Sequence, residues 1–245
     1  MSCLNYLNNQ LYTIMIKKVS PQKASYGGMM YSHDFQLWYT YLKRRIEKGW
    51  RPEELSFLLG RPDHAYLDFE KMYQVRSFLA QESILLDRIY MSSCIEPMEF
   101  HRERYEVTEE RLVRLHIEED EVKWNYQMEL SWEFAKGDKK PAAPKLQFEE
   151  WKSEKDIQIE SDAMLHVRQK IDGLLDQEFF VYGAAPWQLF RKVKETGQVH
   201  LQIYPRHLKN VLYGFIQQNR LVVRNMEGRF SFYPVHIASE HIKFN

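Results

Sequence analysis

The sequence has little cysteine, no net charge and no long apolar run. Its 245 residues include only two cysteines, Cys3 and Cys94, which are too few for a disulfide framework and lack the spacing of a metal site. No apolar stretch reaches the length of about 20 residues that a membrane-spanning helix needs, and the N-terminus lacks a secretory hydrophobic segment. We therefore expect a cytoplasmic protein, in a reducing compartment, without a membrane segment.

The charge balance and the missing motifs narrow the function classes. The 34 Lys and Arg residues equal the 34 Asp and Glu residues, so a nucleic-acid surface that covers the whole chain is not expected, although local basic patches remain open. The sequence lacks a GxSxG elbow, a phosphate-binding glycine loop and an HExxH motif, and its nine histidines are scattered. We expect no enzyme activity, no cofactor and no metal.

Three short helical patterns follow one another between residues 33 and 70. The first pattern repeats apolar residues at helical spacing and ends at Gly49, as helices commonly do. The second begins at Pro52, whose fixed φ suits a first helical turn, and closes at Gly60. The third follows Pro62. The length of 245 residues is enough for about two small domains, and this stretch marks the first.

This stretch resembles the lambda-repressor/Cro-like helix-turn-helix of the XRE family. The matching pairs, at the family's spacing, are Gly49-Trp50, Glu54-Leu55, Leu59-Gly60 and Phe69-Glu70. The resemblance covers residues 33–70 only. It implies DNA binding, with base-reading side chains at the start of the third helix, where this sequence has Asp63, His64 and Ala65.

The sequence departs from the family where DNA would be read. Asp63 is acidic, and Pro52 stands where the family often has a polar side chain that contacts phosphate. Phosphate contacts would have to come from the basic side chains nearby. These are Lys43, Arg44, Arg45, Lys48, Arg51 and Arg61. The alternative is a helix-turn-helix that serves as a packing unit or a protein-binding module.

The segments beside this stretch differ in character. Residues 12–16 could form a strand or part of a helix, and Pro21 with Gly27-Gly28 indicates a loop. Helical patterns continue from 72 to about 94. Residues 96–121 contain ten acidic side chains and four arginines, so this segment either meets a basic protein partner or forms a solvated face.

A β-hairpin is predicted before the middle of the chain. Large apolar residues alternate with polar ones from Lys123 to Trp132, and a shorter alternation covers 113–117. The apolar stripe favours a core-facing sheet over a surface that stacks bases. Residues 136–147, which include KGDKKPAAPK, read as a linker. We therefore expect domains at 1–135 and 148–245.

The C-terminal part follows the element order of a winged helix. Three helical patterns cover about 164–175, 186–197 and 205–216, with a short strand at 200–203 and a hairpin at 221–235. From Val199 to Val235 five bases face one acid, Glu227, which gives a net charge of +4. Winged helices bind DNA or protein, so both readings stay open.

These patterns together predict an α+β protein, mainly helical, with a helix-turn-helix bundle and a β-hairpin followed by a winged-helix-like domain. The expected function is transcriptional regulation through double-stranded DNA, with a homodimer as one assembly. An adaptor that binds protein is the alternative, and a component of a mobile element or its defence is a third. The predicted DNA contacts are Lys43, Arg44, Arg51, Arg61, Asp63, His64, Arg206, His207, Lys209, Asn210, Arg224 and Arg229.

Overall fold

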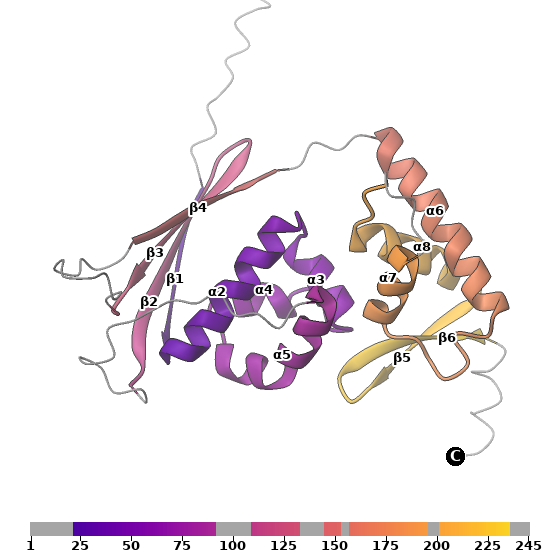
Figure 1. Ribbon diagram of the computed structural model, residues 1–245, viewed down its shortest axis with the longest axis horizontal. Coiled ribbons are helices and arrows are strands. Elements are labelled where there is room, and N and C mark those ends of the chain that lie inside the picture. Colours follow the sequence, from indigo (N-terminus) through magenta and orange to yellow (C-terminus); the bar gives the residue numbers. More distant parts are fainter. Residues whose placement is uncertain (1–21, 92–108, 133–144, 153–156, 196–200, 236–245) are drawn as a thin grey trace, which may run out of the picture.

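The computed structural model describes residues 22–91, 109–132, 145–152, 157–195 and 201–235, which form an α+β structure (Figure 1). The elements are β1 (Gln22–Met30), α2 (Ser32–Glu47), α3 (Pro52–Leu58), α4 (Ala65–Glu70), α5 (Val75–Tyr90), β2 (Arg111–Glu119), β3 (Lys123–Leu130), β4 (Lys145–Trp151), α6 (Ile157–Asp176), α7 (Pro186–Glu195), α8 (Pro205–Gln217), β5 (Leu221–Met226) and β6 (Arg229–Pro234). The α+β class expected from the sequence is confirmed.

Strands β1 to β4 form one antiparallel sheet in chain order. The predicted hairpin is β2–β3, in which Leu115 pairs with Met128 and Ile117 with Tyr126. Large apolar side chains alternate along these strands and pack against helix α2, where the ring centres of Phe35 and Trp132 lie 5.7 Å apart. One face of the sheet is therefore covered by helices.

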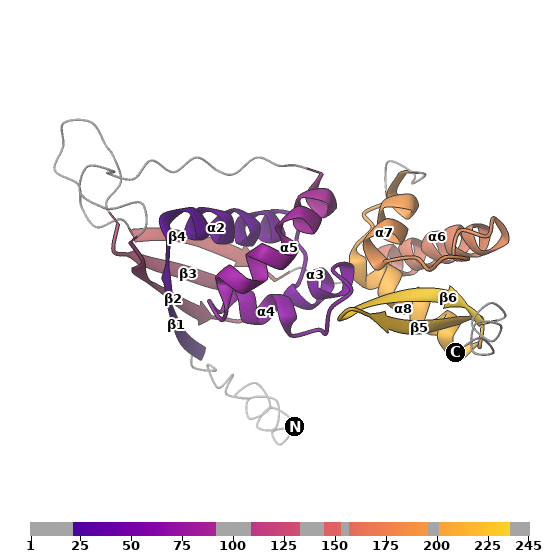
Figure 2. The ribbon, with the colours of Figure 1, turned by 90° about the horizontal axis from the view of Figure 1, so that it is seen from below.

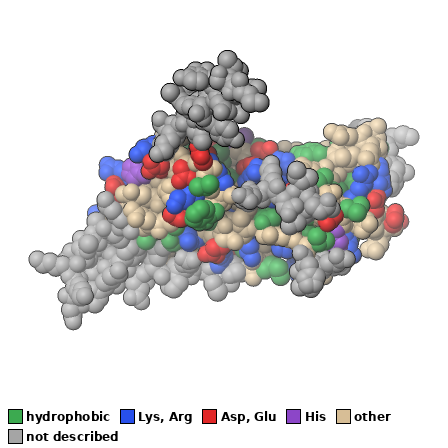
Figure 3. All heavy atoms as spheres, turned by 90° about the horizontal axis from the view of Figure 1, so that it is seen from above, with side chains coloured by type: hydrophobic (Ala, Val, Ile, Leu, Met, Phe, Trp, Pro, Cys, Tyr) green, Lys and Arg blue, Asp and Glu red, His purple; other side chains and the backbone are tan. Residues whose placement is uncertain are grey.

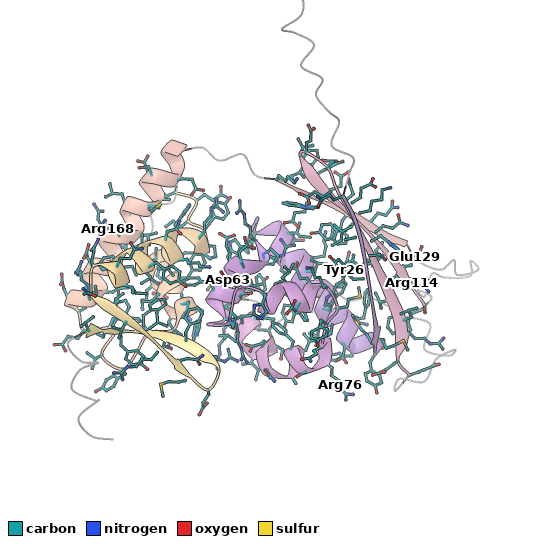
Figure 4. The ribbon with its side chains drawn as sticks, turned by 180° about the vertical axis from the view of Figure 1, so that it is seen from behind. Tyr26, Asp63, Arg76, Arg114, Glu129 and Arg168 are labelled. Atoms are coloured by element: carbon teal, nitrogen blue, oxygen red, sulfur yellow. The ribbon has the colours of Figure 1, made fainter. Side chains whose placement is uncertain are left out.

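The other face of the sheet carries cross-strand ion pairs. Lys23 lies 3.3 Å from Glu118, and Arg114 lies 3.9 Å from Glu129. Figure 4 labels Arg114 and Glu129 on the side of the sheet away from the helices. Exposed pairs of this kind add little stability, so this face is a solvated surface.

Helices α2 to α5 form the N-terminal helical unit, which lies beside the sheet. Two glycines in the left-handed region, Gly49 at φ 63° and Gly60 at φ 69°, end α2 and the turn after α3 at the predicted places. The buried Trp38 indole donates a hydrogen bond of 2.9 Å to the carbonyl oxygen of Phe69. This bond ties α2 to α4.

Helices α6 to α8 and the β5–β6 hairpin form the C-terminal unit. The predicted hairpin is confirmed, with Val223 opposite Phe232 and Asn225 opposite Phe230. Ala184, between α6 and α7, makes an antiparallel bridge with Phe232 of β6. This single bridge is not a strand, and residues 201–203, which were expected to be a strand, are not in one either.

The two helical units share one hydrophobic core. Buried side chains from α2 to α5, the sheet and α6 to β6 form a single continuous cluster. Figures 1 and 2 show the sheet, the N-terminal unit and the C-terminal unit as three successive blocks, with α3 next to α8 and the β5–β6 hairpin.

Two sequence predictions need correction, and three predicted segments lie wholly or mostly outside the described residues. Gly27 and Gly28 belong to strand β1 and not to a loop, because Gly28 lets the strand approach Met72 closely. Phe148 to Trp151 belong to the N-terminal sheet through β4 and not to the C-terminal domain. Residues 12–16, most of the linker and residues 96–108 lie outside the described part. No helix in the described part is long and apolar enough to cross a membrane.

Candidate functional site

The residues predicted to contact DNA do not share one exposed face. Five of them, from both predicted reading faces, meet where α3, the turn after it and α5 contact α8 and the β5–β6 hairpin. We call this contact the junction, and the five residues are Arg61, Asp63, Arg206, Lys209 and Arg229. Figure 4 labels Asp63 at the edge of the N-terminal unit that faces the C-terminal unit.

Lys209 and Asp63 pair with each other across the junction. The ammonium nitrogen of Lys209 lies 2.7 and 2.8 Å from the two carboxylate oxygens of Asp63. The Asp63 side chain is 64% exposed, whereas that of Lys209 is 19% exposed. The predicted base-reading position of one unit therefore neutralises a predicted groove-contacting lysine of the other.

Arg206 is held by carboxylates from both units. Its backbone N–H donates to Glu54 Oε1 at 3.0 Å, and its guanidinium donates to Glu160 Oε1 at 2.5 and 3.1 Å. The guanidinium also lies 4.0 Å from the ring centre of Tyr204. Burial alone would lower the pKa of Arg206, but the hydrogen bond to Glu160 and the charge of Glu54 raise that pKa above its ordinary value.

His207 is buried and serves the start of α8. Its Nδ1 accepts a hydrogen bond of 3.2 Å from the backbone N–H of Tyr204, and its Nε2 lies 2.8 Å from Glu160. Burial lowers the pKa of His207 despite the neighbouring carboxylate. The imidazole is therefore neutral near pH 7, with Nε2–H as a donor to Glu160. At 1% exposure, His207 is not accessible to a phosphate.

A buried carboxylate in α5 receives two arginines from the junction. Glu82 is 1% exposed and lies 2.6 Å from Arg61 Nη2 and 2.8 Å from Arg229 Nη2, the second contact being an ion pair without hydrogen-bond geometry. Arg61 also donates to the carbonyl oxygen of Gly228 at 3.1 Å, and Arg229 to that of Gln81 at 3.0 Å. Each arginine thus bridges the two units.

Aromatic side chains fill the centre of the junction. Phe57 is fully buried, and its ring centre lies 6.0 Å from Phe230 and 6.4 Å from Phe232 of the hairpin. Trp50 meets Phe190 of α7 edge to face at 5.6 Å. Aromatic contacts of this type add stability beyond the area they bury. The junction therefore resembles a domain core more than a loose contact.

The turn after α3 is fitted to the hairpin. The backbone N–H of Phe230 donates a hydrogen bond of 2.8 Å to the carbonyl oxygen of Gly60. A Cβ atom at position 60 would lie 2.9 Å from the carbonyl oxygen of Phe230. Two features therefore require glycine at position 60: its positive φ and the close approach of the Phe230 carbonyl oxygen.

The other predicted DNA contacts lie outside the junction. They are Lys43, Arg44, Arg51, His64, His207, Asn210 and Arg224. Lys43 lies over the Phe148 ring at 5.1 Å, and Arg44 lies 3.9 Å from Asp87. His64 and Asn210 are exposed. Arg45, from the expected phosphate-contacting run, is only 1% exposed and is enclosed by carboxylates.

Five residues that form the junction were not predicted from the sequence. These are Glu54, Phe57, Glu82, Glu160 and Phe230. One signal was present, because α3 has apolar residues on more than one face: Phe57 does not share the stripe of Leu55, Leu58 and Leu59. A helix that is apolar nearly all round is buried nearly all round.

Within the described residues, no three His, Cys, Asp or Glu side chains are placed to hold a metal ion together. Comparison with protein-family models, with curated proteins and with solved structures finds no match.

Proposed function

We propose that this protein works as an adaptor that binds other proteins, and that its two helix-turn-helix-type units serve packing and partner binding. One observation carries the proposal. The side chains expected to read DNA, Asp63 in one unit and Arg206 and Lys209 in the other, are paired at the junction.

The junction is built to stay closed. Separating the units would expose Phe57 and Phe230 to water and would take Arg229 away from the buried carboxylate of Glu82, which would keep only Arg61 of its own unit. Removing one partner of a buried ion pair commonly costs about 3–5 kcal/mol, and truncating a buried Phe costs a similar amount. An arrangement of this strength argues against routine opening to admit a duplex.

Surface charge supports the same proposal. The chain is neutral overall, and Figure 3 shows acidic, basic and apolar side chains interspersed on the visible described surface. A protein that neutralises many phosphates needs a continuous basic face. The acidic stretch that includes Glu110 and Glu121, both exposed, is the part of the described surface best suited to a basic protein partner.

DNA binding is the second candidate, and the topology of the C-terminal unit favours it. An isolated bridge pairs Ala184, between α6 and α7, with Phe232 of β6, and a winged helix has a strand at this place in its element order. If the junction opened, Lys209 and Arg229 would lose their partners Asp63 and Glu82, whereas the Arg206 guanidinium would keep Glu160 of α6.

Retention on bulk duplex DNA at low salt distinguishes the two candidates. We expect the wild-type protein to pass through, and the Arg206→Glu/Lys209→Glu double variant to behave identically. The Phe57→Ala variant, which loosens the junction, tests whether an opened form of the protein binds DNA. Far-UV circular dichroism checks that this variant is folded. We also expect this variant to pass through.

Retention of any of these proteins contradicts the adaptor proposal. Retention of wild type but not of the double variant would establish DNA binding through α8. Retention of Phe57→Ala alone would establish binding by an opened form. Equal retention of wild type and double variant would place the DNA contacts elsewhere.

A further inference from the structure

A cavity of about 700 Å³ lies between the inner face of the sheet and helices α2 to α4. Its walls are largely apolar and aromatic, and they include Leu42, Leu67, Leu115, Ile117, Trp124 and Tyr126. The five junction residues Arg61, Asp63, Arg206, Lys209 and Arg229 do not line the cavity. Cavities of this size and lining commonly bind small organic molecules.

The buried end of the cavity carries one guanidinium and two carboxylates. Arg45 donates from Nε to Glu70 Oε1 at 2.5 Å and, in bidentate fashion, to Glu150 at 2.7 and 2.9 Å. The Tyr126 hydroxyl donates to Glu150 Oε2 at 2.6 Å. With both carboxylates ionised, which for Glu70 requires a pH above its raised pKa of about 7, this group has a net charge of −1. It therefore favours a positive charge or a strong donor from a ligand.

One carboxylate oxygen in this group has no partner. Glu70 makes its hydrogen bond through Oε1, and no donor in the described residues reaches Oε2. The Glu70 side chain is only 8% exposed and lines the cavity. Burial raises the pKa of Glu70 to about 7, although Arg45 acts in the opposite direction.

The open end of the cavity has the opposite charge. Lys71 lines it, lies 5.6 Å from the Tyr26 ring centre, and makes no ion pair with a carboxylate of the described residues. Arg51 is half exposed and only 3.9 Å from Glu53, a weak pair. Figure 4 labels Tyr26 on the side of the sheet that faces the helices. Outside the buried group, the lining holds four cations, Lys23, Arg51, Lys71 and Lys152, and two carboxylates, Glu53 and Glu119, so this part of the lining is net basic.

We propose that this cavity binds a small zwitterionic organic molecule. A cationic nitrogen of the ligand would donate to Glu70 Oε2, an apolar or aromatic body would contact Leu115 and Tyr126, and an anionic group would lie near Lys71 and Arg51. This polarity distinguishes the site from a general apolar pocket, because each end selects one charge.

Three molecules of matched shape test the proposal by calorimetric titration of the full chain. They are 4-(aminomethyl)benzoate, which has both charges at opposite ends, benzylamine, which has the cation alone, and 4-methylbenzoate, which has the anion alone. We expect the zwitterion to bind most tightly, benzylamine next and 4-methylbenzoate at least tenfold more weakly than the zwitterion, since a charged hydrogen bond changes affinity by about tenfold or more.

Variants at the two ends separate the two contacts. Glu70→Gln keeps the acceptor for Arg45 and removes the negative charge. It should therefore weaken the binding of the zwitterion and of benzylamine by about tenfold and leave the binding of 4-methylbenzoate unchanged. Lys71→Met should weaken the zwitterion and leave benzylamine unchanged. Glu129→Gln, on the solvated face of the sheet, is the control and should change the affinity for none of the three molecules.

The proposal is overturned if none of the three molecules binds, if 4-methylbenzoate binds as tightly as benzylamine, or if Glu70→Gln leaves the affinity for the zwitterion unchanged. Because Glu70→Gln preserves side-chain shape and Lys71→Met acts at the exposed end, loss of folding is separable from loss of binding by circular dichroism.

Discussion

Arg45 follows the helical spacing of the buried residues of α2, although its charge suggested an exposed position. Its position continues the buried stripe of Phe35, Trp38 and Leu42 along α2, so helical spacing predicts that it faces the core. Its charge suggested a phosphate contact instead. The partners that make burial tolerable, Glu70 and Glu150, come from α4 and β4 and are distant in the sequence. No local pattern can reveal such a pairing.

The raised pKa of Glu70 predicts a pH-dependent stability. Between the ordinary Glu pKa near 4.5 and the folded value of about 7, the folded state binds the proton that the unfolded state releases. The free energy of unfolding should therefore fall as the pH rises through this window, by up to about 3 kcal/mol. The charged groups that act on Glu70 are Arg45, which lowers its pKa, and Glu150 and Glu53, which raise it.

Urea unfolding of wild type and Glu70→Gln at several pH values between about 4.5 and 8 measures this contribution. The variant lacks the titrating group, so its stability should fall less with pH than that of wild type. Parallel pH profiles for the two proteins would contradict the assignment.

At the scale of elements, alternation predicted β2 and β3 and missed β1 and β4. β1 contains Gly27 and Gly28, which signal a loop in isolation, but which here permit close packing on Met72. In β4 the expected apolar position is taken by Glu150, which faces inward to pair with Arg45. Both strands depend on contacts that the local sequence does not contain.

The turn after α3 offers a prediction with a matched control. Gly60→Ala should destabilise the protein by about 2 kcal/mol or more, because Ala is strained at positive φ and its Cβ would approach the Phe230 carbonyl oxygen. Gly214→Ala in α8 meets no neighbour and should stabilise by about 0.5–1 kcal/mol. Thermal unfolding of both variants gives the two signs. A neutral Gly60→Ala would mean that the turn is not held against the hairpin.

At the scale of the whole molecule, the sequence predicted the helices of both units but not their mutual arrangement. The side chains predicted to contact DNA in each unit were expected to face solvent, because charged side chains at the start of a helix are usually exposed. The contacts that cover them join residues such as Asp63 and Lys209, which are far apart in the chain. Charge complementarity between two separate faces becomes visible only when both are placed.

The shared core predicts that the chain unfolds as one unit. Tryptophan fluorescence and far-UV circular dichroism should give coincident urea transitions, because α3 packs on both sides. Phe57→Ala should lower the stability of the whole chain by about 3–4 kcal/mol. Tyr182→Ala, at a side chain 94% exposed, should change it by less than about 0.5 kcal/mol. Two separate transitions in wild type would show that the units fold independently.

The placement of Glu150 on β4 has a practical consequence for dissecting this protein. A fragment that ends before residue 145 would lack the edge strand β4, and Arg45 would lose Glu150, its bidentate acceptor. Shortened versions of the N-terminal half should therefore be cut after Trp151. Work on pieces ending earlier would report on a damaged scaffold, whatever activity was being assayed.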